Sequence, residues 1–242
     1  MKAMIFAAGL GTRLKPITDN LPKALVPICG KPLLEHVLEK LEDAGIQEFV
    51  VNIHHFADKI ETWLAEHPQP VQVRFSDERD LLRETGGGIL HARPLLEDAT
   101  HFLVHNVDIL SNLDLKRFME DARPEALATL VVSERQTKRY LLFDPELRLV
   151  GWTNIATGEV RSPYPDLDVK SCRMLAFSGI HYISNEIFQL MEGWGEKFSI
   201  IDFYLAVCAE HPIYGWVPEH LRMVDVGKIE TLDQAEELCR VL

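Results

Sequence analysis

A short apolar segment at the start of the chain leads into a loop that carries glycines and an arginine. Residues 2–8 have the length of a buried strand, and Gly9, Gly11 and Arg13 follow at once. Glycine lets backbone N–H groups approach an anion closely because no Cβ intrudes, and the planar guanidinium of arginine binds phosphate oxygens. Lys23 adds a compact positive charge further along the same stretch. These residue types and their order predict a phosphate-binding site.

Other kinds of glycine-containing turn remain alternatives for this stretch. Two glycines alone would equally suit an ordinary turn between a strand and a loop. A Rossmann dinucleotide loop needs a third glycine where this chain has Leu14, and a helix that begins at once, which Pro16 delays. A P-loop needs Gly-Lys followed by Ser or Thr, and this loop lacks that triplet.

Two aspartates stand at the ends of apolar segments and are candidates for a metal site. Asp108 closes the segment 101–108, and Asp225 stands near the end of 221–226. Because ligands bind at the carboxyl ends of strands in open α/β sheets, we expect both side chains to converge on one sheet edge. Mg²⁺ binds through few carboxylates together with phosphate oxygens and water, so the pair predicts a magnesium site beside the phosphate loop. Each aspartate taken alone would also fit a turn or a helix cap.

The composition limits the classes of function. The 242 residues include 25 basic and 37 acidic side chains, which gives a formal net charge of −12. Such an acidic chain is unsuited to non-specific nucleic-acid binding, so the phosphate site must be a local group of cations. No apolar segment has the length of a membrane span, and we expect a cytoplasmic protein with neither a nucleic-acid nor a membrane partner. The four cysteines form no C-x-x-C pair, which argues against structural zinc or a disulfide framework.

Strand-like and helix-like segments alternate through the first half of the chain. Strands are predicted at 2–8, 48–53, 71–75, 101–108 and 126–132, and helices at 32–44, 55–65, 89–95 and 115–122. This order predicts an α/β fold with a Rossmann-like, mostly parallel central sheet flanked by helices. The three glycines at 86–88 are predicted to form a loop that enters the helix at 89–95.

The second half of the chain differs in pattern. Further elements are predicted as short antiparallel strands within 140–152, strands at 174–183, 213–217 and 221–226, and helices at 185–191, 201–209 and 229–241. The segment 153–173 is polar and rich in turns. We expect one domain over 1–242, with a small antiparallel elaboration in the second half.

The motifs, taken in order, resemble those of sugar-1-phosphate nucleotidyltransferases. They are K-A-M-I-F-A-A-G-L-G-T-R-L, P-K-A-L-V-P, S-D-E-R, E-T-G-G-G-I, a strand ending N-V-D, F-S-G-I-H-Y and V-D-V-G. The resemblance covers nearly the whole chain and is closest to the short N-acetylmuramate-1-phosphate uridylyltransferases of cell-wall sugar recycling. It implies a nucleotide-binding half at 1–135, a sugar-binding half at 136–242, and a nucleoside triphosphate and a sugar 1-phosphate as substrates.

The resemblance also implies roles for individual residues. The nucleotide-binding residues would be Ala8, Gly9, Gly11, Thr12, Arg13, Lys23, Gly87 and Asn106, with Arg13 and Lys23 also catalytic. The sugar-binding residues would be Ser178, Gly179 and Ile180. Asp108 and Asp225 would hold Mg²⁺, and the loop before 89 resembles the version that takes UTP. Val107 stands where the family usually has glycine, Lys228 replaces a common threonine, and Lys170 is the candidate for a second phosphate-binding lysine.

The implied reaction needs no general base. A sugar-1-phosphate oxygen, already anionic, attacks the α-phosphorus of the triphosphate and pyrophosphate leaves, so catalysis consists of positioning and charge neutralisation. The histidines at 54, 55, 101 and 105 form no zinc pattern and are interpreted as structural or surface residues. The alternatives are a guanylyl- or cytidylyltransferase for another sugar phosphate, and a non-catalytic sensor of nucleotide sugars on the same scaffold.

Overall fold

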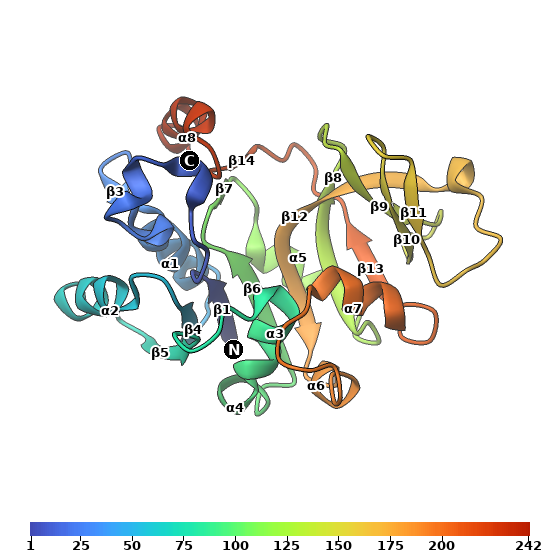
Figure 1. Ribbon diagram of the computed structural model, residues 1–242, viewed down its shortest axis with the longest axis horizontal. Helices are drawn as coiled ribbons and strands as arrows, with labels where there is room; N and C mark the ends of the chain where they lie inside the picture. Colours follow the sequence, from blue (N-terminus) through green and yellow to red (C-terminus); the bar gives the residue numbers. More distant parts are fainter.

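The computed structural model describes residues 1–242 as helices packed on both faces of one large sheet (Figure 1). The strands are β1 (Lys2–Phe6), β2 (Pro27–Ile28), β3 (Lys31–Pro32), β4 (Glu48–Ile53), β5 (Gln72–Asp77), β6 (His101–Asn106), β7 (Ile109–Ser111), β8 (Ala128–Ser133), β9 (Arg139–Phe143), β10 (Leu149–Asn154), β11 (Glu159–Arg161), β12 (Arg173–Ser184), β13 (Ile213–Trp216) and β14 (Met223–Asp225). The helices are α1 (Leu33–Asp43), α2 (Ala57–Glu66), α3 (Glu84–His91), α4 (Arg93–Leu96), α5 (Leu115–Glu120), α6 (Ile187–Leu190), α7 (Ile200–Val207) and α8 (Leu232–Cys239).

The main sheet is mostly parallel and confirms the predicted Rossmann-like α/β class. Strands β6, β1, β4 and β5 run parallel in that order, and β8 and β13 form a second parallel pair. The long strand β12 lies between β6 and β8, antiparallel to both. Its first residues also pair with β9, which continues into β10 and β11 as the predicted antiparallel elaboration. Figure 1 shows this elaboration projecting at one end of the molecule.

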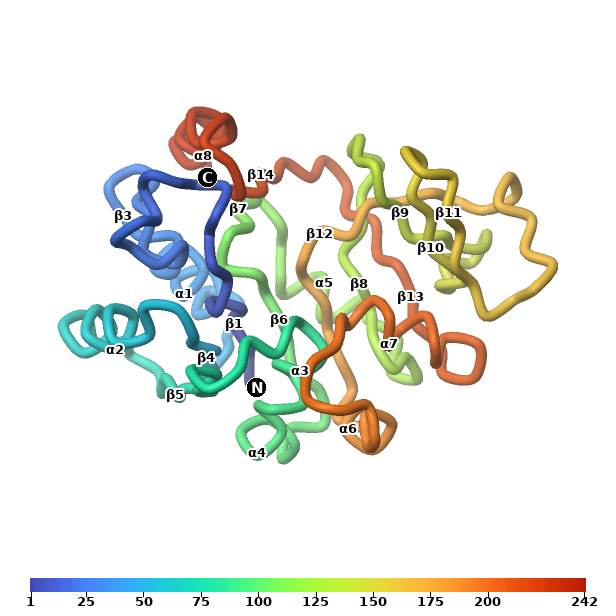
Figure 2. The backbone as a smooth tube through the Cα atoms, viewed as in Figure 1, coloured from blue at the N-terminus to red at the C-terminus, as the bar shows by residue number.

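Two hydrophobic cores lie on opposite faces of the sheet. Along β1, Ala3 and Ile5 face one core and Met4 faces the other, so the strand is apolar throughout. Helices α1, α2, α5 and α8 cover the first face, and α3, α4, α6 and α7 cover the second. The last helix, α8, returns beside the β2–β3 hairpin near the start of the chain (Figure 2), where Glu236 accepts a hydrogen bond from the Cys29 N–H at 2.8 Å. No helix combines the length and the apolar character needed to cross a membrane.

The glycines at 86–88 lie inside helix α3, so the prediction of a loop before the helix is wrong at this point. The N–H groups of Gly86 and Gly87 donate to the carbonyl oxygen of Phe198 at 2.9 and 3.2 Å. A Cβ on Gly87 would lie 2.3 Å from the carbonyl oxygen of Glu196, and one on Gly86 would lie 2.4 Å from the Phe198 ring. Each glycine costs the helix about 1 kcal/mol relative to alanine. Glycine is nevertheless needed here, because the helix backbone packs directly against residues 196–198 and leaves no room for a Cβ.

Two of the sheet's histidines are buried and neutral. On β12, His181 Nδ1 lies 2.7 Å from the Tyr204 hydroxyl of α7, and burial lowers the pKa of His181 to about 3. On β6, burial lowers the pKa of His105 to about 4, and its Nδ1 lies 2.8 Å from the Asn106 carbonyl oxygen. His105 is therefore a structural residue, as the sequence suggests.

We expect the free energy of unfolding to fall as the pH drops from 7 to 5. The folded pKa of His181 lies below the value of about 6.5 in the unfolded chain, so unfolding takes up a proton in this window. Stability is complete above pH 6.5 and declines below it, by about 1–2 kcal/mol at pH 5 for this residue. Urea unfolding at both pH values measures the effect. His181→Gln should reduce the change in the free energy of unfolding between the two pH values, and His67→Gln, at an exposed position, is the control. An unchanged pH dependence in His181→Gln would contradict the lowered pKa of His181.

Candidate active site

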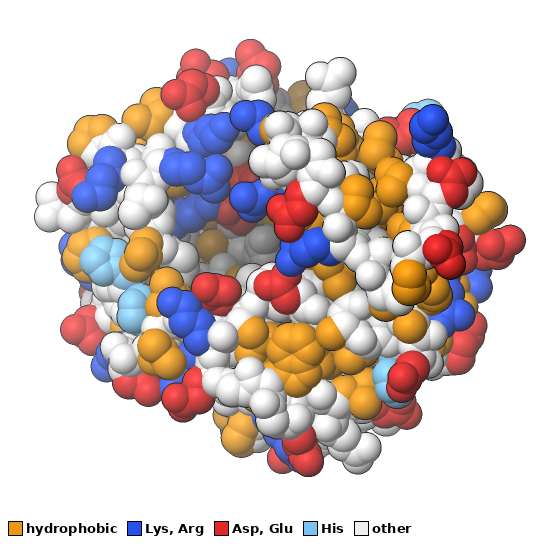
Figure 3. All heavy atoms as spheres, turned by 45° about the vertical axis from the view of Figure 1, so that its right-hand side comes forward, with side chains coloured by type: hydrophobic (Ala, Val, Ile, Leu, Met, Phe, Trp, Pro, Cys, Tyr) orange, Lys and Arg blue, Asp and Glu red, His pale blue; other side chains and the backbone are white.

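A cavity of about 410 Å³ opens at the carboxyl ends of β1, β4 and β6. Five residues predicted from the sequence line it, namely Ala8, Gly9, Lys23, Asn106 and Asp108. Figure 3 shows this side of the molecule hollowed near its middle, with lysine and arginine side chains gathered along one border of the hollow. The cations are therefore concentrated locally on an otherwise acidic protein, as the net charge requires.

A buried amide fixes the backbone that follows β1. The side-chain oxygen of Asn52, on β4, accepts hydrogen bonds from the N–H groups of Ala7 and Ala8 at 2.7 and 3.1 Å. Its amide nitrogen donates to the fully buried Glu78 at 2.8 Å, and Glu78 also accepts the Arg83 N–H at 3.1 Å. The network ties the start of the phosphate loop to the segment that leads into α3. Sequence reasoning missed Asn52, although a single amide inside an apolar strand was an available signal.

The two loop glycines serve different purposes. Gly11 has a φ of +64°, and an added Cβ would lie 3.0 Å from Thr18 Cγ2. The Thr18 hydroxyl donates to the Gly11 carbonyl oxygen at 2.8 Å, which holds the turn closed. An added Cβ on Gly9 would meet nothing within 4 Å, so the space above Gly9 is open to a ligand. Thr12 is exposed and begins the short 3₁₀ turn that presents Arg13.

Pairing of β7 with β14 brings the two predicted aspartates together. Asp225 lies opposite Ile109 in this antiparallel pair, and the Val226 N–H donates to the Asp108 carbonyl oxygen at 2.8 Å. Asp108 forms an ion pair with Lys23, and both side chains are largely buried. Residues from three distant parts of the chain therefore meet at one point beside the cavity.

Opposing charges surround Asp225. Burial, and then the neighbouring charge of Asp108, raise the pKa of Asp225 above its ordinary value. Lys23, Arg13 and Arg135 act in the opposite direction. The carboxylate thus has one anion and three cations around it, which is the charge pattern of a site for phosphates and a divalent cation.

The two aspartates suit Mg²⁺ in number and type. No group of three or more His, Cys, Asp or Glu side chains is arranged to hold a metal ion by itself. Mg²⁺ needs only one or two carboxylates when phosphate oxygens and water complete its shell. Gly227 keeps the space beside Asp225 free, because a Cβ there would lie 2.7 Å from Asp225 Oδ1 and 2.9 Å from Arg13 Nη2.

The residues predicted for the sugar lie behind the cavity rather than along its wall. Gly179 has a φ of +72° at a bulge in β12, and an added Cβ would lie 2.6 Å from the Asn106 side chain. Ser178 and Ile180 are buried, and Ile180 belongs to the core. Their bulge supports Asn106 from behind the cavity, and the sugar-binding role of these three residues stays a prediction. Phe177, just before the bulge, lines a second cavity that is described below.

The remaining residues singled out from the sequence differ in whether the structure places them at the cavity. Val107 is buried and its N–H donates to the Phe6 carbonyl oxygen at 3.2 Å, so the structure accommodates valine in place of glycine. Lys228 is exposed beside Gly227. Lys170 lies in the loop between β11 and β12. It lines neither this cavity nor the second cavity described below. Gly87 does not line the cavity either, because its N–H is bonded to Phe198.

The first two residues of α3 line the cavity, and its three glycines do not. Glu84 and Thr85 line it, and Glu84 has the unusual φ of +61°. The Thr85 hydroxyl oxygen accepts the Ile200 N–H at 2.9 Å, which joins α3 to the start of α7. A strained backbone next to a cavity is a feature of ligand sites, and sequence reasoning missed both residues.

Gly87→Ala and Gly9→Ala should separate stability from binding. Gly87→Ala forces a Cβ against a backbone carbonyl, so we expect a loss of about 1–3 kcal/mol in the free energy of unfolding. Gly9→Ala meets no atom in the protein and should keep its stability, while raising the KM for the triphosphate because the methyl group enters the ligand's space. Urea unfolding and steady-state kinetics on both variants check this. Equal stabilities would contradict the packing role of Gly87.

A second cavity, of about 540 Å³, adjoins the first. Both include Ser199, the residue that caps α7. The second cavity lies against the antiparallel elaboration and is lined by three arginines, at 135, 139 and 161. Sequence reasoning missed all three, because nothing in their spacing marks them as a group.

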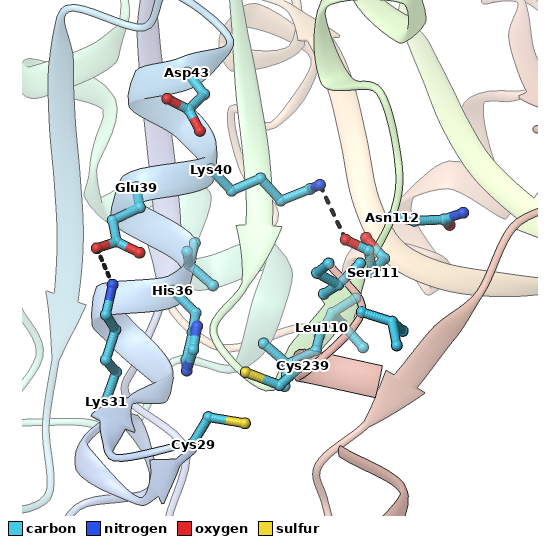
Figure 4. A pocket seen from close by; sticks show the side chains of 14 residues that line it. Cys29, Lys31, His36, Glu39, Lys40, Asp43, Leu110, Ser111, Asn112 and Cys239 are labelled. Carbon is cyan, nitrogen blue, oxygen red and sulfur yellow. Dashed lines mark hydrogen bonds and ion pairs between the residues drawn. The ribbon is translucent and has the colours of Figure 1, made fainter. Parts of the chain in front are cut away.

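A third cavity, of about 510 Å³, lies between α1, β7 and the end of the chain (Figure 4). Lys40 crosses it and donates to the carbonyl oxygens of Ser111 and Leu113 at 3.0 and 2.6 Å. The sulfur atoms of Cys29 and Cys239 point into the same space. It shares no residue with the cavity at the phosphate loop, and it is larger. Volume therefore does not identify the active site; the lining side chains do.

Comparisons with known proteins agree with this geometry. Residues 2–142 match the nucleotidyl transferase family. The chain is 35% identical over 230 residues to the N-acetylmuramate alpha-1-phosphate uridylyltransferase of Caulobacter vibrioides, covering 91% of this chain and 90% of that protein. It is 35% identical over 122 residues to the mannose-1-phosphate guanyltransferase of Hypocrea jecorina, covering 50% and 34%. Among solved structures, HddC from Yersinia pseudotuberculosis complexed with GMP-PN superposes with a TM-score of 0.77 at 26% identity, covering 98% of both chains. The chain belongs to the nucleotidyl transferase family and is a sugar-1-phosphate nucleotidyltransferase.

Proposed function

We propose that this enzyme joins UTP to N-acetylmuramate 1-phosphate, releasing pyrophosphate and a uridine-diphosphate sugar in a Mg²⁺-dependent reaction. The observation that carries the proposal is the 35% identity to a uridylyltransferase of that sugar over nine tenths of both chains. The shared length matters, because the guanyltransferase relative matches only half of this chain.

The triphosphate lies over the loop after β1. The open space above Gly9 admits the phosphates, and the backbone of Ala8 is held in place by Asn52. Lys23 neutralises charge on the α-phosphate, and Arg13 binds the outer phosphate oxygens through its fork. The nucleobase lies toward the start of α3, where Thr85 lines the cavity.

Asp108 and Asp225 would hold Mg²⁺. The ion, when bound, supplies positive charge that offsets the negative charge of the phosphates. Lys23 pairs with Asp108 in the absence of ligands, and it would be free to contact the nucleotide if Asp108 served as a metal ligand. The chain's own contribution is to keep two carboxylates and the cations of Arg13 and Lys23 within one small region.

The reaction forms one bond and breaks one bond at phosphorus. An anionic oxygen of the sugar 1-phosphate attacks the α-phosphorus, and the bond from that phosphorus to the bridging oxygen of the β-phosphate breaks. Pyrophosphate leaves with the bonding electrons, and no proton needs to be removed from the nucleophile. Catalysis of such a transfer consists of positioning the two substrates and neutralising their charge.

A guanylyltransferase is the second candidate. It is favoured by the overall similarity to the structure of HddC complexed with GMP-PN. The two candidates differ in the base edge that the region around Thr85 must accept. A mismatched base leaves buried polar groups unpaired, at about 1–3 kcal/mol each, so kinetics discriminate clearly.

Pyrophosphate release with a panel of nucleotides and sugars tests the proposal. UTP, dTTP, CTP, GTP and ATP are each combined with N-acetylmuramate 1-phosphate, N-acetylglucosamine 1-phosphate, glucose 1-phosphate and mannose 1-phosphate, with and without Mg²⁺. The highest kcat/KM is expected for UTP with N-acetylmuramate 1-phosphate. A preference for GTP would replace the proposed nucleotide and leave the transferase reaction in place.

A further inference from the structure

The second cavity contains three arginines but only one of them is neutralised. Arg161 forms an ion pair with Asp202 at 2.6 Å and lies 3.7 Å from a Glu159 carboxylate oxygen. Its guanidinium also stacks over the ring of Trp152, 4.1 Å from the centroid. Both acidic side chains that line this cavity therefore lie beside Arg161. Its positive charge is neutralised, and it has a structural role in the cavity wall.

Arg135 and Arg139 have no acidic partner. Neither forms an ion pair with any carboxylate of the chain, although ion pairs surround them. The Arg135 guanidinium donates to the Phe177 carbonyl oxygen at 2.9 Å, which holds it at the cavity. The Arg139 side chain makes no hydrogen bond within the protein and is exposed. Two like charges at one cavity repel each other, and an anion between them would remove that repulsion.

The turn that carries both arginines is fixed by side-chain hydrogen bonds. The Thr137 N–H donates to the Tyr140 hydroxyl at 3.0 Å, and the Arg139 N–H donates to the Thr137 hydroxyl oxygen at 3.4 Å. The backbone at 135–140 is therefore held in shape before a ligand arrives. Such preorganisation reduces the entropy lost when the two side chains bind one anion.

The position of this pair matches the far end of the sugar. The nucleotide cavity and the arginine cavity adjoin at Ser199, so a sugar phosphate reaching the α-phosphorus near Lys23 extends toward Arg139. Arg135 lines the second cavity, and it lies near enough to Asp225 for its charge to oppose the rise in the pKa of that carboxyl. A group bound by Arg139 thus belongs to the sugar and not to the triphosphate.

We propose that Arg135 and Arg139 bind a carboxylate carried by the sugar, so that the enzyme selects sugar 1-phosphates with a second, carboxylate anion. Guanidinium forks match carboxylates in charge and in geometry, whereas sugar hydroxyls are served equally well by neutral groups. The inference rests on the proposed function and adds the two residues that discriminate N-acetylmuramate 1-phosphate from neutral sugars.

The test compares two sugars that differ in this carboxylate. N-acetylglucosamine 1-phosphate has the same ring as N-acetylmuramate 1-phosphate without the carboxylate-bearing ether. We expect the wild-type kcat/KM to favour the acidic sugar by roughly 10- to 100-fold, the scale of charge-assisted hydrogen bonds. Arg139→Ala and Arg139→Gln should reduce this ratio by about tenfold or more, and Arg139→Lys, which keeps the charge, should retain part of it.

Arg173→Ala is the matched control. Arg173 belongs to the same elaboration but lies near Glu134, at 3.6 Å, and lines neither cavity, so its loss should leave the ratio as in the wild type. An equal fall for both sugars in Arg139→Ala would mean that the arginine holds the 1-phosphate, and it would overturn the inference. Equal use of both sugars by the wild type would also overturn it while the proposed reaction stands. Pyrophosphate release with neither sugar would overturn the proposed function together with this inference.

Discussion

Lys23→Ala is expected to lower turnover by ~10²-fold or more, the scale of losing one charge contact made in the transition state. Lys23 is held in a short turn after Pro22 and lies beside Asp108, so its ammonium group is confined to the reaction centre. Steady-state release of pyrophosphate at saturating substrates and Mg²⁺ measures the effect. Because the contact strengthens in the transition state, kcat should fall more than the KM for the triphosphate rises.

The same change should alter stability in a metal-dependent way. Without Mg²⁺, the variant leaves the largely buried Asp108 without its partner and near Asp225, and we expect a loss of about 1–3 kcal/mol in the free energy of unfolding. Mg²⁺ should recover part of it. Lys15→Ala is the control: Lys15 belongs to the same loop and pairs with Asp19 at 3.1 Å, but it is 59% exposed. Near-normal turnover in Lys23→Ala, or an equal loss in Lys15→Ala, would refute the role of Lys23.

The parts of the site that depend on local pattern could be predicted from the sequence. The apolar run of β1, the glycines after it and the spacing to Lys23 are contiguous, and each has a direct physical meaning. The leucines of α1 recur at helical spacing, and Gly45, with a φ of +82°, ends that helix as expected. The expected meeting of Asp108 and Asp225 is confirmed, but by a different route: β14 pairs with β7 in a separate two-stranded sheet, so the two residues do not share an edge of the main sheet.

The parts that depend on contacts between distant segments could not be predicted. The glycines at 86–88 have the composition of a loop, and only the close approach of residues 196–198 makes a helix the better solution. Ile180 belongs to a motif near the site, yet the register of β12 against β6 turns its side chain into the core. Periodicity does not specify such a register, because a shift of one residue reverses every side chain.

The arginines of the second cavity could not be predicted from the sequence either, although here the sequence understates their importance. In sequence, Arg135 and Arg139 are ordinary members of a polar segment before a strand. Their significance depends on which arginines find acidic partners, and Asp202, which neutralises Arg161, lies 41 residues further along the chain. Unpaired charge is a property of the folded molecule, so it appears only when all partners are placed.

Asp108→Asn and Asp225→Asn should each lower Mg²⁺-dependent kcat/KM by roughly 10³-fold, because each removes one of the two carboxylates available to the ion. Their effects on the metal-free protein should differ in sign. Asp225 is opposed by partial desolvation and by the charge of Asp108, but the residue is exposed, so replacing it should leave the free energy of unfolding unchanged or slightly higher. Replacing Asp108 leaves Lys23 largely buried without its partner, and a loss of about 1–3 kcal/mol is expected.

Urea unfolding without Mg²⁺, together with activity over a Mg²⁺ titration, measures both effects. Asp58→Asn removes an equal charge from a side chain that is 90% exposed and controls for net charge. Wild-type activity of either active-site variant at limiting Mg²⁺ would exclude that residue as a ligand. Stability changes of the same sign in both variants would show that Lys23 does not distinguish the two carboxylates, and the proposed transfer of Lys23 from Asp108 to the nucleotide would then lose its physical basis.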